Sequence, residues 1–167
     1  MASRIPHGDI KVLDVGTGFA GNAEFLAKTL SDGSRIWTLD PSAEVLTKAR
    51  ETLEAQGLGR RVEFVKGSIE RVDLSGESFD LVISVMALHH MKSLQAALDG
   101  MSRVVRGGGK VLLADFSPEA ARKLKFGGLH KAADFFSAEA VKSALRGRMR
   151  TSRAWDFGLW YIIEATK

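Results

Sequence analysis

The sequence predicts a doubly wound α/β fold, with a mixed sheet of about seven strands that is parallel except for a late antiparallel hairpin at one edge. Short apolar segments alternate with segments of helical periodicity from residue 10 to residue 116, which is typical of parallel strands joined by crossover helices on both faces. Residues 81–88 are almost continuously apolar, as expected of a central strand covered on both sides. Residues 151–167 contain two strand-like runs around Asp156–Gly158, too close together for an intervening helix.

Each predicted element follows from its local pattern. In the first helix Phe25, Leu26 and Leu30 have helical spacing, and in the second Leu46 and Leu53 do. The three glycines at 107–109 predict a turn into the fifth strand. The predicted strands are residues 10–15, 35–40, 61–67, 78–88 and 110–116, and the predicted helices are residues 21–31, 41–57, 93–105 and 137–149.

Length and composition predict a single domain over residues 1–167. The chain has 45% hydrophobic and 26% charged residues, which is ordinary for a globular protein. Since there is no cysteine, disulfides, cysteine-based metal sites and cysteine nucleophiles are excluded. No apolar run approaches the roughly 20 residues that span a bilayer, and the first ten residues do not resemble a secretory signal. We therefore expect a cytoplasmic protein without a membrane segment.

Positive charge is concentrated late in the chain. The net charge is +4, and residues 121–153 contain nine Lys or Arg residues against only Asp134 and Glu139. This segment could bind a polyanion such as RNA, or it could be a solvated surface. The sequence leaves both interpretations open.

The segment VLDVGTGFAG at residues 12–21 predicts a cofactor loop. Ligands of open α/β sheets bind beyond the carboxyl ends of the strands, and Gly16 and Gly18 would let a ligand approach the backbone there. The structural alternative is a tight turn. Asp40 ends the second strand, where a carboxylate can accept both hydroxyls of a ribose. Its alternative role is to cap the second helix, with Pro41 at the first helical position.

Asp14 helps to separate the cofactors that such a loop could hold. A dinucleotide would place a pyrophosphate near this carboxylate, and like charges repel. S-adenosylmethionine carries an ammonium and a sulfonium group, which a carboxylate attracts. The alternative is that Asp14 braces the turn by local hydrogen bonds.

Five segments resemble the motifs of class I S-adenosylmethionine-dependent methyltransferases, in order and with similar spacing. They are VLDVGTG, TLDPS, FVKGSIE, SFDLVISVMALHHM and RVVRGGGKVLLADF, of which the last two are most similar to the small group called type 11. The resemblance implies a Rossmann-like fold and S-adenosylmethionine as the cofactor. Two positions differ from the family pattern, because Ala20 replaces a common third glycine and Ser68 replaces a common aspartate.

The resemblance also implies a role for each matching residue. The loop residues Gly16, Thr17 and Gly18 would contact the methionine and ribose parts, while Asp14 would hold the loop or the amino group. The remaining contacts would be Asp40 to the ribose hydroxyls, Ser68 and Ile69 to the adenine, and Ser84 to the methionine end.

The acceptor side carries fewer signals. His89 and His90 follow the fourth strand, where one of them could act as a base or could simply pack and hydrate a turn; adjacent histidines do not suit a metal ion. The insertion at 117–137 contains Phe126, His130, Phe135 and Phe136, which could shape a pocket or fill the core. We expect a small-molecule or RNA acceptor and a homodimer, with an NAD-dependent oxidoreductase or a non-catalytic S-adenosylmethionine-binding module as alternative functions.

Overall fold

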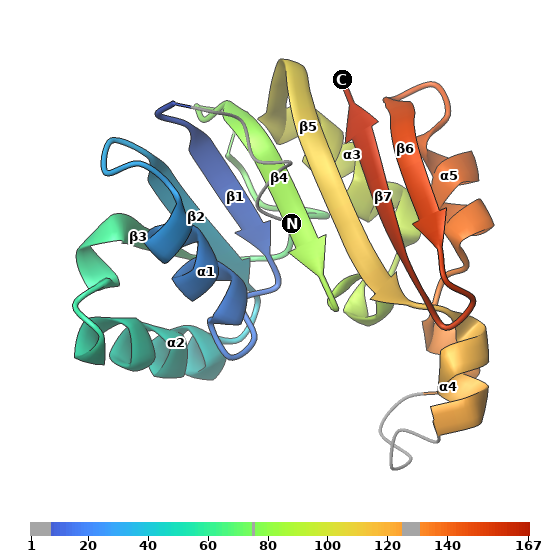
Figure 1. The fold of residues 1–167 in the computed structure, drawn as a ribbon, viewed down its shortest axis with the longest axis horizontal. Helices are drawn as coiled ribbons and strands as arrows, with labels where there is room; N and C mark the ends of the chain where they lie inside the picture. Colours follow the sequence, from blue (N-terminus) through green and yellow to red (C-terminus); the bar gives the residue numbers. More distant parts are fainter. Residues whose placement is uncertain (1–7, 75, 125–130) are drawn as a thin grey trace.

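The computed structural model describes residues 8–74, 76–124 and 131–167. One seven-stranded sheet has the order β3-β2-β1-β4-β5-β7-β6 (Figure 1). The first five strands are parallel, and β7 lies antiparallel between β5 and β6. The predicted mixed α/β fold is therefore confirmed. The strands are β1 (Lys11–Val15), β2 (Arg35–Asp40), β3 (Val62–Lys66), β4 (Phe79–Val85), β5 (Val105–Phe116), β6 (Arg150–Asp156) and β7 (Trp160–Thr166).

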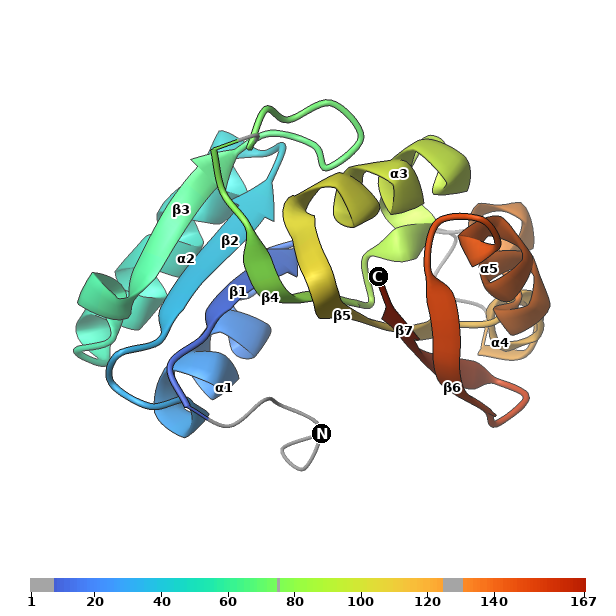
Figure 2. The same ribbon diagram turned by 90° about the horizontal axis from the view of Figure 1, so that it is seen from above.

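Helices cover both faces of the sheet. One core lies beneath α1 (Gly21–Thr29) and α2 (Ala43–Ala55), and the other lies beneath α3 (Leu94–Val104) and α5 (Ala138–Leu145). Figure 2 shows α1 on one side of the sheet and α3 and α5 on the other. The short α4 (Pro118–Leu124) follows β5. No helix among the described residues is long and apolar enough to cross a membrane.

The buried face of α1 differs from its prediction. Ala23, Leu26, Ala27 and Leu30 are buried, whereas Phe25 is 38% exposed. These four residues are spaced i, i+3, i+4 and i+7, which makes one stripe of a helix. Phe25 lies outside that stripe, although the sequence groups it with Leu26 and Leu30 as an apolar residue of the helical pattern.

Two strand ends also differ from the sequence patterns. The fourth strand ends at Val85, before the apolar run does, because Met86 adopts a left-handed conformation with φ 57°. The fifth strand begins at Val105 and includes the three glycines, for which the sequence predicts a turn. Its register with β4 shifts between Phe79 and Leu81, so the glycines accommodate an irregular stretch of strand.

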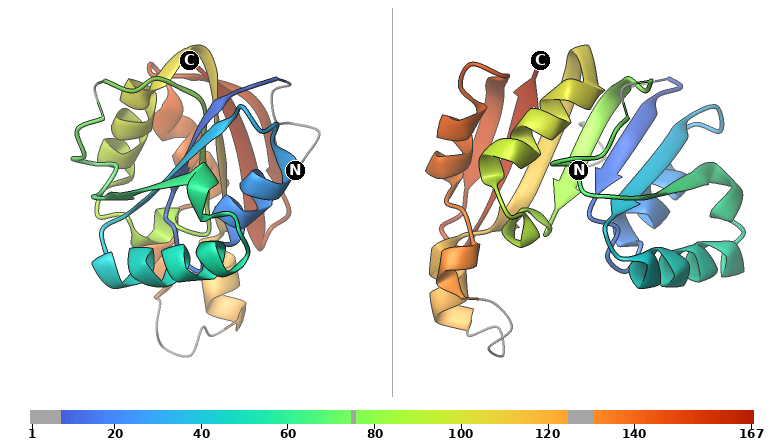
Figure 3. Two further views of the ribbon diagram at one scale, coloured as in Figure 1. Left: turned by 90° about the vertical axis from the view of Figure 1, so that its left-hand side faces the viewer. Right: turned by 180° about the vertical axis from the view of Figure 1, so that it is seen from behind.

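Part of the sheet is bare on the α1 side. There, α1 and α2 cover the half that contains β2 and β1, and no described helix lies over β5, β7 and β6 (Figures 1 and 3). Trp160 on β7 is 41% exposed, and Phe157 in the preceding turn is 53% exposed. Their rings stack at 4.3 Å between centroids.

Candidate active site

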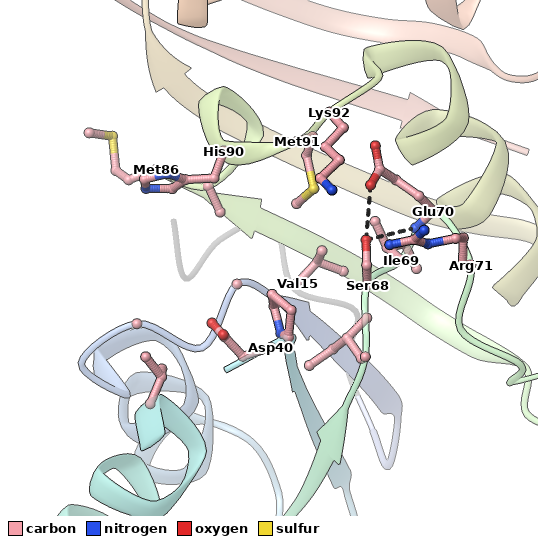
Figure 4. Close-up of a pocket in the computed structure, with 17 residues that line it drawn as sticks. Val15, Asp40, Ser68, Ile69, Glu70, Arg71, Met86, His90, Met91 and Lys92 are labelled. Carbon is pink, nitrogen blue, oxygen red and sulfur yellow. Dashed lines mark hydrogen bonds between the residues drawn. The ribbon is translucent and has the colours of Figure 1, made fainter. Parts of the chain in front are cut away.

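A cavity of about 530 Å³ opens at the carboxyl ends of β1, β2, β3 and β4. This is the edge at which open α/β sheets bind ligands. Figure 4 shows Val15, Asp40 and Ser68 on one side of the cavity, and His90, Met91 and Lys92 on the other. Among the residues predicted to bind the cofactor, five line the cavity: Gly16, Gly18, Asp40, Ser68 and Ile69.

The glycine loop between β1 and α1 needs glycine for two reasons. Gly16 has φ 97°, and a Cβ on it would overlap the Cβ of Ala87. Its N–H donates to the carbonyl of Leu39 at 2.9 Å, which fixes the loop against β2. Gly18 has φ 49° and open space where its Cβ would stand, so this glycine leaves room for a ligand on the cavity side.

Asp14 lies beneath the loop and is fully buried. Its Oδ2 accepts from the hydroxyl of Thr38 at 3.0 Å, and its Oδ1 accepts from Nδ2 of Asn22 at 3.2 Å. The hydroxyls of Thr38 and Thr17 are 2.8 Å apart and also share a hydrogen bond. Asp14 therefore braces the loop, and neither it nor Thr17 lines the cavity.

Burial changes the charge of Asp14. Loss of solvent, opposed by the bonds from Thr38 and Asn22, raises its pKa from 3.8 to about 7. About half of the carboxyl groups are then neutral at pH 7. The electrostatic argument for a positively charged cofactor is correspondingly weaker than the sequence suggested, and contact with the cofactor's amino group stays a prediction.

Asp40 is the last residue of β2, and it is not the cap of the second helix. Ser42 is the cap, because its hydroxyl accepts from the N–H of Val45 at 3.3 Å. The Oδ1 of Asp40 accepts from the N–H of Ser42 at 2.9 Å, and no described residue donates a hydrogen bond to its Oδ2. The capping alternative for Asp40 is therefore wrong, and the carboxylate lies at the cavity wall with one oxygen unused.

The loop after β3 is held against α3. A Cβ on Gly100 of α3 would overlap the carbonyl oxygen of Ile69, so this helix approaches the loop closely. Glu70 accepts from the N–H of Ser93 at 2.7 Å through Oε1. Its Oε2 accepts from the hydroxyl of Ser68 at 3.1 Å (Figure 4). Ser68 thus uses its proton on Glu70, and its oxygen accepts from the Glu70 N–H at 3.4 Å. One lone pair of that oxygen is left for a donor in the cavity.

Ser84 does not line the cavity. It lies on β4 with no exposed surface, and its hydroxyl has no hydrogen-bond partner among the described residues. The next two residues of the chain turn towards the surface, and Met86 lines the cavity instead. A role of Ser84 at the methionine end stays a prediction.

The two histidines occupy different environments. The His89 side chain is 7% exposed, and its Nδ1 lies 2.9 Å from Oδ1 of the buried Asp115. The N–H of His89 also donates to Asp115, and the ring stacks on Phe135. His90 is exposed and lines the cavity. His90 is therefore the better placed of the two to meet an acceptor, while His89 is part of the packed core.

The basic segment is largely engaged in ion pairs. Arg122 and Lys123 pair with Glu119, Lys142 and Arg146 pair with Glu139, and Arg148 pairs with Asp99. In the insertion, Phe135 is buried in the core and Phe136 packs against it. Phe126 and His130 lie outside the described residues. The described part of the insertion thus supports core packing for these two phenylalanines.

Several site residues were missed by the sequence analysis. Val45, Glu70, Arg71, Met86 and Lys92 line the cavity, and Asp115 orients His89. Asp115 lies near the end of β5, so the rule that directs attention to strand ends could have identified it. Nothing in the sequence indicated the pairing of Glu70 with Ser68. The described residues contain no group of three or more His, Cys, Asp or Glu side chains that could hold a metal ion.

Comparison with known proteins identifies the family. A family model described as "Methyltransferase domain" matches residues 13–113. The chain belongs to this methyltransferase family. It is 27% identical over 115 residues to the ubiquinone/menaquinone biosynthesis C-methyltransferase UbiE of Coxiella burnetii, covering 69% of this chain and 46% of that protein. It is 29% identical over 120 residues to a glycine/sarcosine/dimethylglycine N-methyltransferase of Actinopolyspora halophila, covering 71% and 21%.

The fold comparison agrees with the family. The crystal structure of a SAM-dependent methyltransferase from Aquifex aeolicus superposes with a TM-score of 0.80 at 22% identity, covering 93% of this chain and 81% of that one. This chain therefore shares the fold of a SAM-dependent methyltransferase. The chain spans about half or less of the length of the two curated relatives. One of these relatives methylates carbon and the other nitrogen, so family membership does not specify the acceptor atom.

The residues of this methyltransferase domain fit S-adenosylmethionine. The cavity volume of about 530 Å³ lies within the range of small-molecule sites. The open space at Gly18 can receive the methionine part, and the free oxygen of Asp40 can accept from the ribose. Ser68 lines the same cavity, and the lone pair that the Glu70 N–H does not use can accept from an amino group.

Proposed function

We propose that this chain transfers a methyl group from S-adenosylmethionine to an acceptor bound beside His90. The observation that carries the proposal is the cavity at the strand ends, which combines a glycine loop with an unused carboxylate oxygen of Asp40. When bound, S-adenosylmethionine supplies a methyl group on a positively charged sulfur, and the electrons of the broken S–C bond remain on that sulfur.

The chain itself positions the reactants. Asp40 accepts from the ribose hydroxyls, and Ser68 accepts from the adenine amino group while Glu70 fixes the direction of its hydroxyl. Gly16 and Gly18 let the backbone approach the methionine part. His90 can take the proton that the acceptor loses, because a neutral imidazole has a ring nitrogen that accepts a proton. Most of the catalytic effect would come from aligning the acceptor with the methyl group.

The acceptor, the assembly and the location belong to the same proposal. A small-molecule acceptor is favoured over RNA, because five of the basic residues in 121–153 already have carboxylate partners. We also propose that the enzyme acts in the cytoplasm, because its reaction requires a supply of S-adenosylmethionine in the same compartment. A homodimer is retained as a proposal that measurement of the molecular mass in solution will test.

Binding of S-adenosylhomocysteine tests the proposal most directly. We expect it to raise the melting temperature, and we expect NAD to have no effect. Asp40→Ala should weaken S-adenosylhomocysteine binding about tenfold or more, because it removes hydrogen bonds to a charged group. Ser42→Ala is the matched control: it removes the cap of α2 and costs about 1 kcal/mol of stability, but it leaves the carboxylate at the cavity.

Two results would contradict the proposal. Stabilisation by NAD in place of S-adenosylhomocysteine would favour an oxidoreductase. Binding of S-adenosylhomocysteine without transfer of labelled methyl to any fraction of a cell extract would favour a non-catalytic binding module. If label does transfer, nuclease and protease treatment of the product will distinguish RNA, protein and small-molecule acceptors.

A further inference from the structure

A second cavity, of about 410 Å³, adjoins the cofactor cavity. It lies at the same edge of the sheet, between the ends of β4 and β5 and the start of β7. Met86 lines both cavities, so ligands in the two would meet at this residue. The N–H of Met86 donates to the carbonyl of Ala114 at 2.8 Å, which fixes the boundary between them.

The lining of this second cavity is apolar and partly aromatic. Seven of its eight described residues carry no charge; they include Val85, Met86, Ala114, Phe116, Trp160 and Ile162. Phe116 and Trp160 are partners in the β5–β7 register, and the Trp160 ring stacks on Phe157 at an interplanar angle of 19°. Large exposed aromatic rings of this kind stack favourably on another planar ring.

Charge decides between classes of ligand. Among the described residues of the lining, Asp115 is the charged one, and its oxygens already accept from the N–H groups of His89 and Phe116. A phosphate or other anion would therefore meet this carboxylate without a cation from that lining, which is unfavourable in an apolar site. A cation would find a carboxylate that is already hydrogen-bonded. An uncharged ligand fits the lining without either cost.

From these observations, and resting on the proposed function, we propose that the second cavity binds the methyl acceptor, and that this acceptor is a small molecule with an uncharged planar ring. Trp160 stacks on the ring, while Val85, Ala114 and Ile162 support it from the sheet. The reacting atom lies towards Met86, across which the cofactor cavity begins. In this arrangement Trp160 determines acceptor specificity and takes no part in cofactor binding.

The three tryptophans of the chain make the test possible without an activity assay. Each indole N–H gives one nitrogen-correlated NMR signal, and substitution of each tryptophan by phenylalanine assigns the three signals. Protein saturated with S-adenosylhomocysteine is titrated with 2-naphthol, with decahydro-2-naphthol, which lacks the planar ring, and with 2-naphthyl phosphate, which adds charge. We expect saturable shifts of the Trp160 signal with 2-naphthol, weaker binding of the other two probes, and an unchanged signal from the buried Trp37.

Two variants and a control define the site. Trp160→Ala should weaken 2-naphthol binding about fivefold, because it removes an aromatic contact. Ala114→Phe should abolish binding by filling the cavity. Phe25→Ala removes an aromatic ring of similar exposure, 38% against 41% for Trp160, from a different surface and should change nothing. All three variants should retain S-adenosylhomocysteine affinity, which also shows that they fold.

Each other outcome has a defined meaning. Unchanged 2-naphthol affinity in both cavity variants, or preference for 2-naphthyl phosphate, would overturn the inference. So would a dimer that Trp160→Ala converts to monomers, because a second copy would then cover the cavity. If S-adenosylhomocysteine does not bind but the titration still shifts Trp160, the proposed function fails while the apolar site remains. If S-adenosylhomocysteine binds but 2-naphthol does not shift the Trp160 signal, the proposed acceptor site fails while the proposed function remains.

Discussion

Replacement of Asp14 by asparagine should make the protein more stable at alkaline pH. The carboxyl group is fully buried, and its pKa rises from 3.8 to about 7 because burial penalises the charged form. The folded state therefore holds a proton that the unfolded state releases above about pH 4. The contribution of Asp14 to the free energy of unfolding is fully present below the pKa of the unfolded state. It decreases as the pH rises from about 4 to about 7, the pKa of the folded state, and is lost above that value.

The magnitude follows from the two pKa values. At about 1.4 kcal/mol for each pKa unit, a rise from 3.8 to about 7 removes about 4 kcal/mol of unfolding free energy above pH 7. Between pH 5 and pH 8.5 the loss is about 3 kcal/mol. The asparagine side chain of the variant does not titrate, so the difference in stability between Asp14→Asn and the wild type should shift by this amount in favour of the variant.

The hydrogen bonds permit this substitution. Either hydroxyl of the Thr17–Thr38 pair can be the donor, so an asparagine amide can donate to Thr38 while Thr38 donates to Thr17. The asparagine oxygen can still accept from Asn22. Asp14→Leu is a contrasting variant, because it removes the charge but leaves Thr38 and Asn22 without their acceptor, which costs about 1–3 kcal/mol for each buried group.

Urea unfolding of the wild type and both variants at pH 5 and pH 8.5 measures these free energies. Asp14→Asn should gain about 3 kcal/mol relative to the wild type between the two pH values, and Asp14→Leu should be the less stable variant at both. A difference between Asp14→Asn and the wild type that is the same at pH 5 and pH 8.5 would refute the reasoning, since it would mean that Asp14 titrates alike in both states.

Three further predictions concern the site. Gly16→Ala should destabilise the fold by about 2–4 kcal/mol in urea unfolding, since it combines a positive φ with an overlap, while Gly18→Ala should cost about 1 kcal/mol. Glu70→Gln should lower the preference for S-adenosylhomocysteine over S-inosylhomocysteine about fivefold in calorimetry, because the amide frees the Ser68 hydroxyl to donate. Asp115→Asn should cost about 1–3 kcal/mol in urea unfolding, because its amide would face N–H donors.

Specific results would contradict each of these. Equal destabilisation by the two glycine substitutions would show that the overlap with Ala87 is relieved without cost. An unchanged ratio of the two nucleoside affinities in Glu70→Gln, with both ligands still bound, would remove Ser68 from adenine recognition. An Asp115→Asn variant as stable as the wild type would mean that His89 does not depend on this carboxylate.

The fold could be predicted because its signals are local. Alternation of strand and helix patterns, the apolar fourth strand and the Asp156–Gly158 turn all act within a few residues, and the structure follows them. The cofactor cavity could also be located, because the carboxyl ends of parallel strands meet at one edge. Gly16 and Asp40 both lie there.

The predictions that failed concern features that tertiary contacts determine. Phe25 fits a helical pattern, but the sheet selects a neighbouring stripe of α1. The Asp–Pro–Ser sequence permits two caps, and the actual cap, Ser42, is the one whose hydroxyl reaches Val45. Asp115 and His89 are 26 residues apart and meet because β4 and β5 are neighbours. No local pattern contains that pairing, and the departure from the family pattern at Ser68 did not indicate the hydrogen bond to Glu70.

Position relative to the strand end explains why two aspartates have different roles. Asp14 is followed by Val15 within β1, so its side chain remains in the layer between the sheet and α1 and finds only protein donors. Asp40 is the last residue of β2, and its carboxylate therefore reaches the edge where the parallel strands stop. A buried carboxylate influences stability and its pH dependence, whereas a carboxylate at the open edge influences ligand affinity. Asp14→Asn should accordingly change the unfolding curve far more than S-adenosylhomocysteine binding, and Asp40→Asn should do the opposite.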